Sequence, residues 1–408
     1  MPVITIYNGI YCNETAVVHD IKERTGYRLV TDDTVVETAS ELAGMKKDKI
    51  ETAFSSKTSV FNRFTHEKER AIAYLRLAVS KIIVRGNTIL TGYSSLLPPK
   101  EIHHLLRVCI IEDTASRVEA ARQSQGLSAE EAAAVIASDD RDRSAWTETL
   151  FSITDPWASS LYDMMLSPGK TDPGQAAAMI EERLKKATLR QTPDSIAALD
   201  DFVLAAASGA VLADAGHDVN VTSKNGALLI TINKKVLMLN RLEDELKAIA
   251  RDIPGVESVE TRVEPNNQTE AVYRKHPGDL PSKVLLVDDE REFVQTLSER
   301  LQMRDMGCVA AFDGASALDL VRNDDPEVMI LDLKMPGIDG MEVLNRVKEI
   351  RPEIEVIVLT GHGSEQDKQA CLSMGAFAYM QKPIDINTLS QLLKDAHQKY
   401  TTDARMPI

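Results

Sequence analysis

Short apolar runs alternate with amphipathic stretches over roughly the last 120 residues of this chain. Apolar runs bounded by turn signals are typical of buried parallel strands, and such runs lie at residues 283–287, 308–311, 328–331, 356–359 and 377–380. Apolar residues at helical spacing predict helices at residues 290–303, 314–321, 341–350, 365–374 and 386–396. Strands that alternate with helices in this order predict an α/β domain with a doubly wound parallel sheet.

Residues that can carry chemistry follow four of the five predicted strands. They are Asp288 and Asp289 after the first, Asp332 after the third, Thr360 after the fourth and Lys382 after the fifth. The carboxyl ends of parallel strands meet at one edge of a sheet. Three carboxylates repel one another there unless a cation is present, and oxygen ligands suit Mg²⁺, which also binds phosphoryl groups. The pattern therefore predicts a metal-assisted phosphoryl acceptor.

These residues, with the stretch VMILDLKMPGIDG at 328–340, resemble a response-regulator receiver domain along residues 283–402. The resemblance implies a flavodoxin-like sheet with strand order 2-1-3-4-5 and Asp332 as the phosphoacceptor. It also implies that Mg²⁺ is bound by Asp289, Asp332 and the backbone carbonyl of Lys334, with Asp288 acting largely through water. Asp339, in the same loop, is interpreted as a turn-forming residue rather than a ligand.

The same resemblance assigns roles to residues near the last two predicted strands. Lys382 would contact the phosphoryl group beside a cis Lys382–Pro383 bond. Thr360 and Tyr379 would form a switch pair, in which the hydroxyl moves toward the phosphate and the ring turns inward, with Gly361 leaving room for it. Lys334 and His362 would occupy two variable positions that tune dephosphorylation. The alternative is a structural domain with unrelated acids, which four matching strand ends make improbable.

The N-terminus has the order of a phosphate-binding loop, because a predicted strand at residues 3–7 precedes a predicted helix at 15–24. On the template GxxxxGK[ST], Asn8 and Asn13 replace the two glycines and Glu14 replaces the lysine. Only Thr15 fits the template. A carboxylate in place of the ammonium exchanges attraction for repulsion toward a phosphate, so the loop is degenerate.

Residues 1–190 nevertheless resemble a cytidylate-kinase-like nucleoside monophosphate kinase, with a P-loop-type α/β fold. The similar pieces are a helix predicted at 67–84, RGNTILTG (85–92), LLRVCIIEDTASRVE (105–119), a helix start with a capping box at Ser128 and Glu131, and LYDMML (161–166). The resemblance places Arg117 and Arg143 near a nucleotide or in a lid, although surface ion pairs are an equal alternative. Tyr93 stands where the family usually has an arginine. A domain kept for binding or dimerisation is favoured over an active phosphotransferase.

Residues 192–265 predict a small α+β module. A helix at 192–212 is followed by strands at 219–222 and 227–232 around an Asn-Gly turn, then by a helix at 239–251 and a strand at 256–263. This order resembles a BON domain, a family associated with ligand, phospholipid or protein contacts and without catalytic residues to transfer. A purely structural module is an equal alternative. Residues 266–282 are rich in proline and asparagine and predict an interdomain linker.

Composition narrows the function further. The net charge of −15 argues against a nucleic-acid-coating protein, and the sequence contains no basic recognition helix, so a DNA-binding regulator is disfavoured. The sequence shows neither a run of about 18 apolar residues nor a signal peptide. Four scattered cysteines favour reduced thiols and a cytoplasmic location over disulfides or zinc.

The combined hypothesis is a cytoplasmic two-component response regulator. A sensor histidine kinase or a phosphotransfer protein would donate to Asp332, and the N-terminal half would act by binding or self-association. The receiver's own phosphorylation and dephosphorylation would then be the only chemistry. The alternative is an active nucleoside monophosphate kinase that the receiver regulates. A homodimer and a nucleotide or other small ligand of the N-terminal half are left open.

Overall fold

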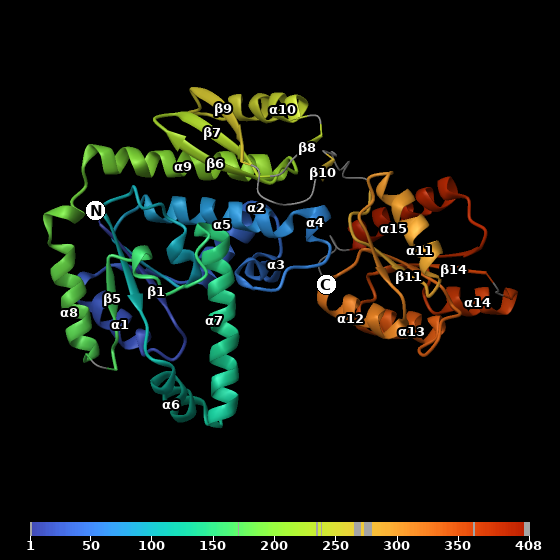
Figure 1. The fold of residues 1–408 in the computed structure, drawn as a ribbon, viewed down its shortest axis with the longest axis horizontal. Coiled ribbons are helices and arrows are strands. Elements are labelled where there is room, and N and C mark those ends of the chain that lie inside the picture. Colours follow the sequence, from blue (N-terminus) through green and yellow to red (C-terminus); the bar gives the residue numbers. More distant parts are fainter. Residues whose placement is uncertain are drawn as a thin grey trace. The chain divides into compact units, whose positions relative to one another are not determined.

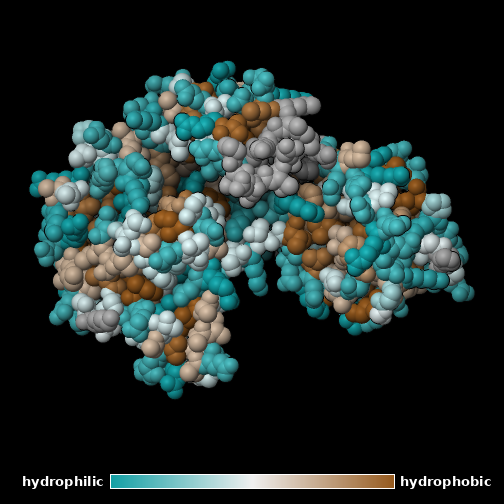
Figure 2. All heavy atoms as spheres, viewed as in Figure 1, coloured by the Kyte–Doolittle hydropathy of each residue, from teal (hydrophilic) through white to brown (hydrophobic). Residues whose placement is uncertain are grey.

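The computed structural model describes residues 2–169, 171–233, 236–237, 239–264, 271–272, 280–361 and 364–403. The chain forms two compact units, drawn in Figure 1. Unit 1 comprises Met1–Thr58 and Glu67–Val272, and unit 2 comprises Ser59–His66 and Tyr273–Ile408. The predicted kinase-like and small modules therefore share one unit. Hydrophilic residues cover most of the face seen in Figure 2.

Unit 1 is built on an all-parallel five-stranded sheet with the order β2-β3-β1-β4-β5. The strands are β1 (Val3–Asn8), β2 (Arg28–Val30), β3 (Thr88–Thr91), β4 (Leu105–Ile110) and β5 (Met164–Leu166). The central strand β1 is almost entirely buried, because helices cover both faces of a parallel sheet. The predicted strand at residues 3–7 is confirmed within one residue at each end.

Two apolar clusters hold the helices of unit 1 on the sheet. One face packs against α1 (Glu14–Thr25) and α8 (Pro173–Leu184). The other packs against α2 (Asp32–Ala43), α5 (Glu67–Ile83), α7 (Ala129–Phe151) and α9 (Pro193–Asp214). The shorter helices α3 (Lys47–Glu51) and α6 (Thr114–Gln125) complete the unit. Helix α7 begins with the capping box predicted at Ser128 and Glu131, in which each side chain accepts from the other residue's backbone N–H.

The small module of unit 1 has the predicted elements. Strands β6 (Val219–Lys224) and β7 (Ala227–Ile232) form an antiparallel hairpin, and β9 (Ser258–Val263) pairs parallel to β7. Asn225 and Gly226 both have positive φ, as a two-residue hairpin turn requires. Helix α10 (Leu239–Arg251) follows, and the strands β8 (Val236–Leu237) and β10 (Ala271–Val272) pair with each other. The linker predicted at 266–282 lies mostly outside the described residues.

Among the described residues, one stretch is long and apolar enough to cross a membrane. It is Ala187–Asp214, with a mean hydropathy of 1.8 in its best window, and it contains α9. Leu199, Phe202 and Ala210 of this helix belong to the apolar cluster that also contains α5. A packed core helix passes the same test on composition, so this finding is weak evidence for a membrane span.

Unit 2 contains the predicted doubly wound sheet, with the order β12-β11-β13-β14-β15 and every pair parallel. This is the expected order 2-1-3-4-5. The strands are β11 (Val284–Val287), β12 (Cys308–Ala311), β13 (Val328–Leu331), β14 (Glu355–Thr360) and β15 (Ala378–Gln381). The helices are α11 (Arg291–Gln302), α12 (Gly314–Asp324), α13 (Gly340–Ile350), α14 (Glu365–Ser373) and α15 (Ile386–Asp403).

Apolar clusters on both faces of this sheet fix the positions of the strand ends. One cluster joins the sheet to α11 and α15, and the other joins it to α12 and α13. The strands β11 and β13 are buried along their whole length. A short upstream helix, α4 (Asn62–Thr65), also belongs to unit 2. The sequence does not predict this helix.

Candidate phosphoacceptor site

Three carboxylates gather at one edge of the unit 2 sheet. Asp288 and Asp289 directly follow β11, and Asp332 directly follows β13, its neighbour in the sheet. One oxygen from each of the three lies within 4.8 Å of the others. Asp288 and Asp332 are buried, whereas Asp289 is exposed. The register of the strands thus brings together the acids that the sequence predicts.

Lys382 is the cation that faces these acids. Its Nζ lies 2.6 Å from Oδ2 of Asp288 and 2.9 Å from Oε1 of Glu290, and it also lies over the ring of Phe293. Burial lowers the pKa of Lys382, but the hydrogen bonds to Asp288 and Glu290 outweigh it, so the net shift is upward and the ammonium stays charged. The peptide bond to Pro383 is cis, as predicted.

The hydrogen bonds and charges around Asp332 favour its charged form less than those around Lys382 do. Its Oδ2 accepts a hydrogen bond from the backbone N–H of Lys334 at 3.2 Å, but its Oδ1 is buried without a hydrogen-bond partner among the described residues. Burial raises the pKa of Asp332, Lys382 lowers it, and the nearby charge of Asp288 raises it further, with a net upward shift. Thr360, fully buried at the end of β14, contributes a hydrogen bond that favours the carboxylate.

The donor set suits a hard divalent cation. Asp288, Asp289 and Asp332 offer only oxygen ligands, which Mg²⁺ and Ca²⁺ prefer over zinc-type sulfur and nitrogen sets. Among the described residues at this edge, three carboxylates share one neighbouring cation, Lys382. The buried Oδ1 of Asp332, which has no hydrogen-bond partner among them, is a position where a bound cation would be favourable. The residues present therefore fit Mg²⁺, with the carbonyl of Lys334 as the further oxygen that the sequence resemblance implies.

The loop after Asp332 depends on Gly340. A Cβ on Gly340 would lie 2.1 Å from the carbonyl oxygen of Asp332 and 2.6 Å from Cα of Leu333. The N–H of Gly340 donates to the carbonyl of Leu333 at 2.9 Å, which closes the loop. Asp339 caps α13 by accepting from the N–H of Glu342. Asp339 thus acts as a structural residue, in agreement with its interpretation from the sequence.

The structure describes both residues of the predicted switch pair, Thr360 and Tyr379, but not the neighbouring His362. Tyr379 is half-buried on β15, and its hydroxyl is buried without a hydrogen-bond partner among the described residues. A Cβ on Gly361 would meet only Cδ of Lys382, at 4.0 Å, so in this conformation Gly361 does not border the Tyr379 ring. His362 lies outside the described residues. Glu290, the second partner of Lys382, is missed by the sequence analysis, although it directly follows the acid pair.

The N-terminal loop presents the wrong groups for a phosphate. The carbonyl of Ile10 accepts from Nε of Arg117 at 3.0 Å, so the loop uses an arginine of its own domain as a partner. Cys12 is fully buried, and burial raises the pKa of its thiol to about 11. Asn13 caps α1 in a left-handed conformation and Glu14 occupies the first turn of the helix. An acid there occupies the helix terminus that would attract an anion.

The remaining template residues do not change this conclusion. Asn8, half-buried at the end of β1, donates to the neighbouring carbonyl of Gly9 at 3.2 Å. Thr15 is exposed in the first turn of α1. A Cβ on Gly9 would lie 2.7 Å from the Ile111 side chain and 3.2 Å from Arg117, so the loop is packed against its own domain.

The two arginines of the kinase-like half form interior ion pairs. Arg117 makes a bidentate pair with Asp140, with both N–O distances 2.9 Å. Nε of Arg143 lies 2.6 Å from Asp139, and its guanidinium lies over the rings of Tyr7 and Tyr93. Both side chains are buried, so the predicted alternative of surface ion pairs is wrong about their location. Nη1 of Arg143 and the hydroxyl of Tyr7 have no hydrogen-bond partner among the described residues.

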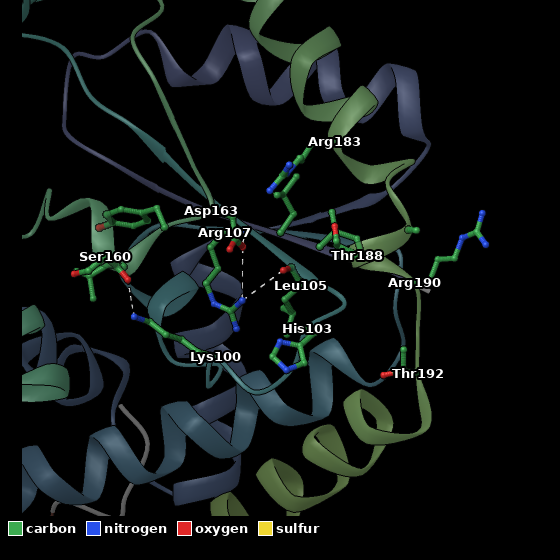
Figure 3. A pocket seen from close by; sticks show the side chains of 15 residues that line it. Lys100, His103, Leu105, Arg107, Ser160, Asp163, Arg183, Thr188, Arg190 and Thr192 are labelled. Carbon is green, nitrogen blue, oxygen red and sulfur yellow. Dashed lines mark hydrogen bonds and ion pairs between the residues drawn. The ribbon is translucent and has the colours of Figure 1, made fainter.

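A basic cavity of about 510 Å³ lies elsewhere in unit 1 (Figure 3). It is lined at the beginnings of β4 and β5, whereas ligands of parallel sheets bind at the carboxyl ends. Two of its cations already have internal partners: Lys100 donates to the carbonyl of Ser160, and Arg107 contacts Asp163. Arg190 extends away from the other labelled side chains. The cavity is therefore a weaker candidate site.

The close approach of Gly340 to Asp332 gives a testable prediction. In Gly340→Ala, the added Cβ would displace the backbone of the acceptor residue, because it would overlap the Asp332 carbonyl. We expect unit 2 to lose about 1–3 kcal/mol of stability and Asp332 to take up phosphate more slowly from acetyl phosphate with Mg²⁺. Gly209→Ala, in open space on α9, is the matched control. Unchanged melting and uptake in Gly340→Ala would contradict the argument.

Comparison with known proteins agrees with this geometry. Residues 284–394 match the family described as response regulator receiver domain, and residues 3–170 match the cytidylate kinase-like family. Sporulation initiation phosphotransferase F of Bacillus subtilis is 36% identical over 121 residues, which are 30% of this chain and 94% of that protein.

Two longer relatives match the same region. Response regulator MprA of Mycolicibacterium vanbaalenii is 32% identical over 124 residues, which are 30% of this chain and 54% of MprA. Transcriptional regulatory protein GlrR of Escherichia coli is 34% identical over 116 residues, which are 28% of this chain and 26% of GlrR, so the chain spans about a quarter of that regulator. Through its C-terminal receiver domain, the chain belongs to the response regulator family.

Proposed function

We propose that the chain is a cytoplasmic response regulator of a two-component phosphorelay. Its receiver would accept a phosphoryl group on Asp332, with Mg²⁺, from a sensor histidine kinase or a phosphotransfer protein. The observation that carries this proposal is the buried Asp332 carboxylate, whose Oδ1 has no hydrogen-bond partner among the described residues, beside two further acids. Lys382 only partly balances this group of acids, and the unpartnered Oδ1 is available to attack a metal-bound phosphoryl donor, which would supply further positive charge.

The roles of the site residues follow from where their atoms lie. Bound Mg²⁺ would neutralise the acids and the phosphoryl oxygens, held by Asp288, Asp289, Asp332 and the carbonyl of Lys334. One oxygen of Asp332 would attack the phosphorus of the donor, and the bond to the donor nitrogen would break. Lys382, now on Asp288 and Glu290, would turn its ammonium toward a phosphoryl oxygen. The Thr360 hydroxyl, at the end of β14, would donate to another.

Phosphorylation would shift an equilibrium between two receiver conformations. A new phosphoryl group draws the Thr360 hydroxyl toward it and leaves space that the Tyr379 ring can enter. The buried, unpartnered hydroxyl of Tyr379 supports a movable ring, because a new position can give this hydroxyl a partner. The surface around β15 and α14 would then differ between the two states.

We infer that the N-terminal half is the effector and acts by binding or self-association. Glu14 in place of lysine, and the Ile10 carbonyl turned toward Arg117, remove the groups that stabilise phosphoryl transfer. The small module is proposed to be BON-like, a binding module for a ligand, a phospholipid or a protein. One side of β7 is buried and the other only half-covered, which leaves a face for such a contact.

A second candidate is an active nucleoside monophosphate kinase regulated by the receiver. One observation favours it: Nη1 of Arg143 and the hydroxyl of Tyr7 are buried without hydrogen-bond partners among the described residues. A phosphate or a base could satisfy both groups. The degenerate loop argues against transfer, so ligand binding without turnover is the form of this candidate that we favour.

The receiver chemistry predicts a single phosphorylated residue. Wild-type protein incubated with acetyl phosphate and Mg²⁺ should gain one phosphoryl group, detected by intact mass. The same incubation with EDTA in place of Mg²⁺ should add none. Asp332→Asn should gain none. Asp339→Asn keeps an N-cap acceptor on the same loop and should still be phosphorylated. Phosphate on Asp332→Asn, or none on the wild type, would refute the assignment.

The N-terminal loop predicts that ATP and CMP produce no turnover. A coupled kinase assay should show no ADP release above background, while an active enzyme would turn over at about 1–100 per second. Glu14→Lys restores the ammonium but leaves the Ile10 carbonyl on Arg117, so we expect it to be inactive too. Calorimetry with each nucleotide separates binding from catalysis. Turnover at ordinary kinase rates by the wild type would establish the second candidate.

A further inference from the structure

Eight residues from the N-terminal part of the sequence fold with the receiver. The segment Ser59–His66 belongs to unit 2, whereas Thr58 and Glu67 on either side of it belong to unit 1. The chain therefore enters unit 2 twice, once through this segment and once near residue 273. In sequence the segment lies within residues 3–170, which match the cytidylate kinase-like family, yet it packs with the receiver.

Phe61 is buried completely within the core of unit 2. Its side chain is 0% exposed and belongs to the apolar cluster that contains Val321 of α12 and Leu285 of β11. Phe64 packs partly on the same cluster. A fully buried phenylalanine removes a large apolar surface from water, so it contributes substantially to holding its segment in place.

Two backbone features complete the attachment. The N–H of Val60 donates to Oδ1 of Asp324, the last residue of α12, at 2.9 Å. A Cβ on Gly307 would lie 2.9 Å from Cβ and Cγ of Phe64, so the absence of a side chain at Gly307 makes room for the ring. The receiver surface next to its edge strand β12 thus accommodates both the backbone of Val60 and the ring of Phe64.

The conformation of the segment depends on this contact. Helix α4 has only four residues, Asn62–Thr65, and helices this short are not stable alone in water. Phe61 and Phe64 are three residues apart and so lie on one helical face. The exposed side chains of Val60 and Arg63 lie off this buried face. The sequence pattern is that of a short docking motif.

The polar stretch before the segment is held by unit 1. The N–H and Oγ of Ser56 donate to Oδ1 of Asp142 at 2.7 and 2.6 Å. Nζ of Lys68, just after the segment, donates to the carbonyl of Ser55 at 2.8 Å. Asp142 lies on α7 next to Arg143. The unit 1 residues before and after the segment are therefore hydrogen-bonded to each other and, through Ser56, to α7.

The docking position and the phosphoacceptor site lie at opposite ends of the receiver strands. Gly307 precedes the amino end of β12, and Asp324 ends α12. Asp332 instead follows the carboxyl end of β13, at the opposite edge of this parallel sheet. The segment can thus stay attached while the receiver is phosphorylated.

We propose that Ser59–His66 is an intramolecular docking segment, with Phe61 and Phe64 anchoring it on the receiver beside β12 and the end of α12. The occupant of this receiver surface is this segment of the same chain. The segment adds a fully buried phenylalanine to the receiver core, so we expect the folded receiver to depend on these upstream residues.

The test compares Phe61→Ala with Val60→Ala in the full-length chain. Val60→Ala is the matched control, because the Val60 side chain is exposed and its backbone hydrogen bond remains. Hydrogen–deuterium exchange should show protected amides at residues 62–66 in the wild type and in Val60→Ala. In Phe61→Ala these amides should exchange at least about tenfold faster, and receiver melting should fall by about 5 °C or more. Equal exchange in the two variants would overturn the proposal.

Two further measurements cover the remaining outcomes. Asp324→Ala removes only the acceptor of the Val60 N–H, so it should speed exchange near residue 60 while the receiver stays folded, even if Phe61→Ala fails to fold. Sedimentation and exchange on dilution test whether the segment docks within one chain. Protection that disappears as a dimer dissociates would show docking between chains and refute the intramolecular form. None of these readouts requires phosphorylation, so they can fail or succeed independently of the role of Asp332.

Discussion

The uneven charge at the carboxyl edge of the unit 2 sheet is the constraint on which its functional geometry depends. Asp288 and Asp332 are buried, and Asp289 and Glu290 stand beside them, while Lys382 is the cation that contacts these acids among the described residues. Buried carboxylates without matched cations are costly. The apolar clusters on both faces of the sheet hold the acids together despite this cost. The site therefore carries an excess of negative charge, which a bound metal ion with a phosphoryl donor can neutralise.

The kinase-like half shows the opposite arrangement with a similar parallel sheet. Arg117 is matched by Asp140 and Arg143 by Asp139, so each buried cation there has its own carboxylate. Such self-neutralised pairs reduce the attraction for an anionic substrate. The loop also lacks its lysine and presents a carbonyl to Arg117. The two halves thus differ in charge balance more than in architecture, and this difference supports a receiver that reacts and a partner half that binds.

The sequence predicts much of this, for reasons that are local. Apolar runs and their turn signals predict the receiver strands, and because the carboxyl ends of parallel strands share an edge, the sequence also predicts that Asp288, Asp289 and Asp332 meet there. The Asn225–Gly226 turn and the Ser128 capping box were likewise predictable, because their hydrogen bonds join neighbours in sequence. The pairing of Arg117 with Asp140 was not, since the choice of partner depends on how α6 and α7 pack.

The docking segment shows where sequence patterns lose information. Phe61 and Phe64 stand in a polar neighbourhood, and their spacing says that they share a face without saying what covers it. Their partners at Gly307 and Asp324 are about 250 residues away in the chain. A boundary drawn from composition near residue 283 would cut the receiver from a phenylalanine in its own core. The receiver unit of this protein therefore includes upstream residues, and its stability depends on side chains that lie more than 200 residues before its first strand.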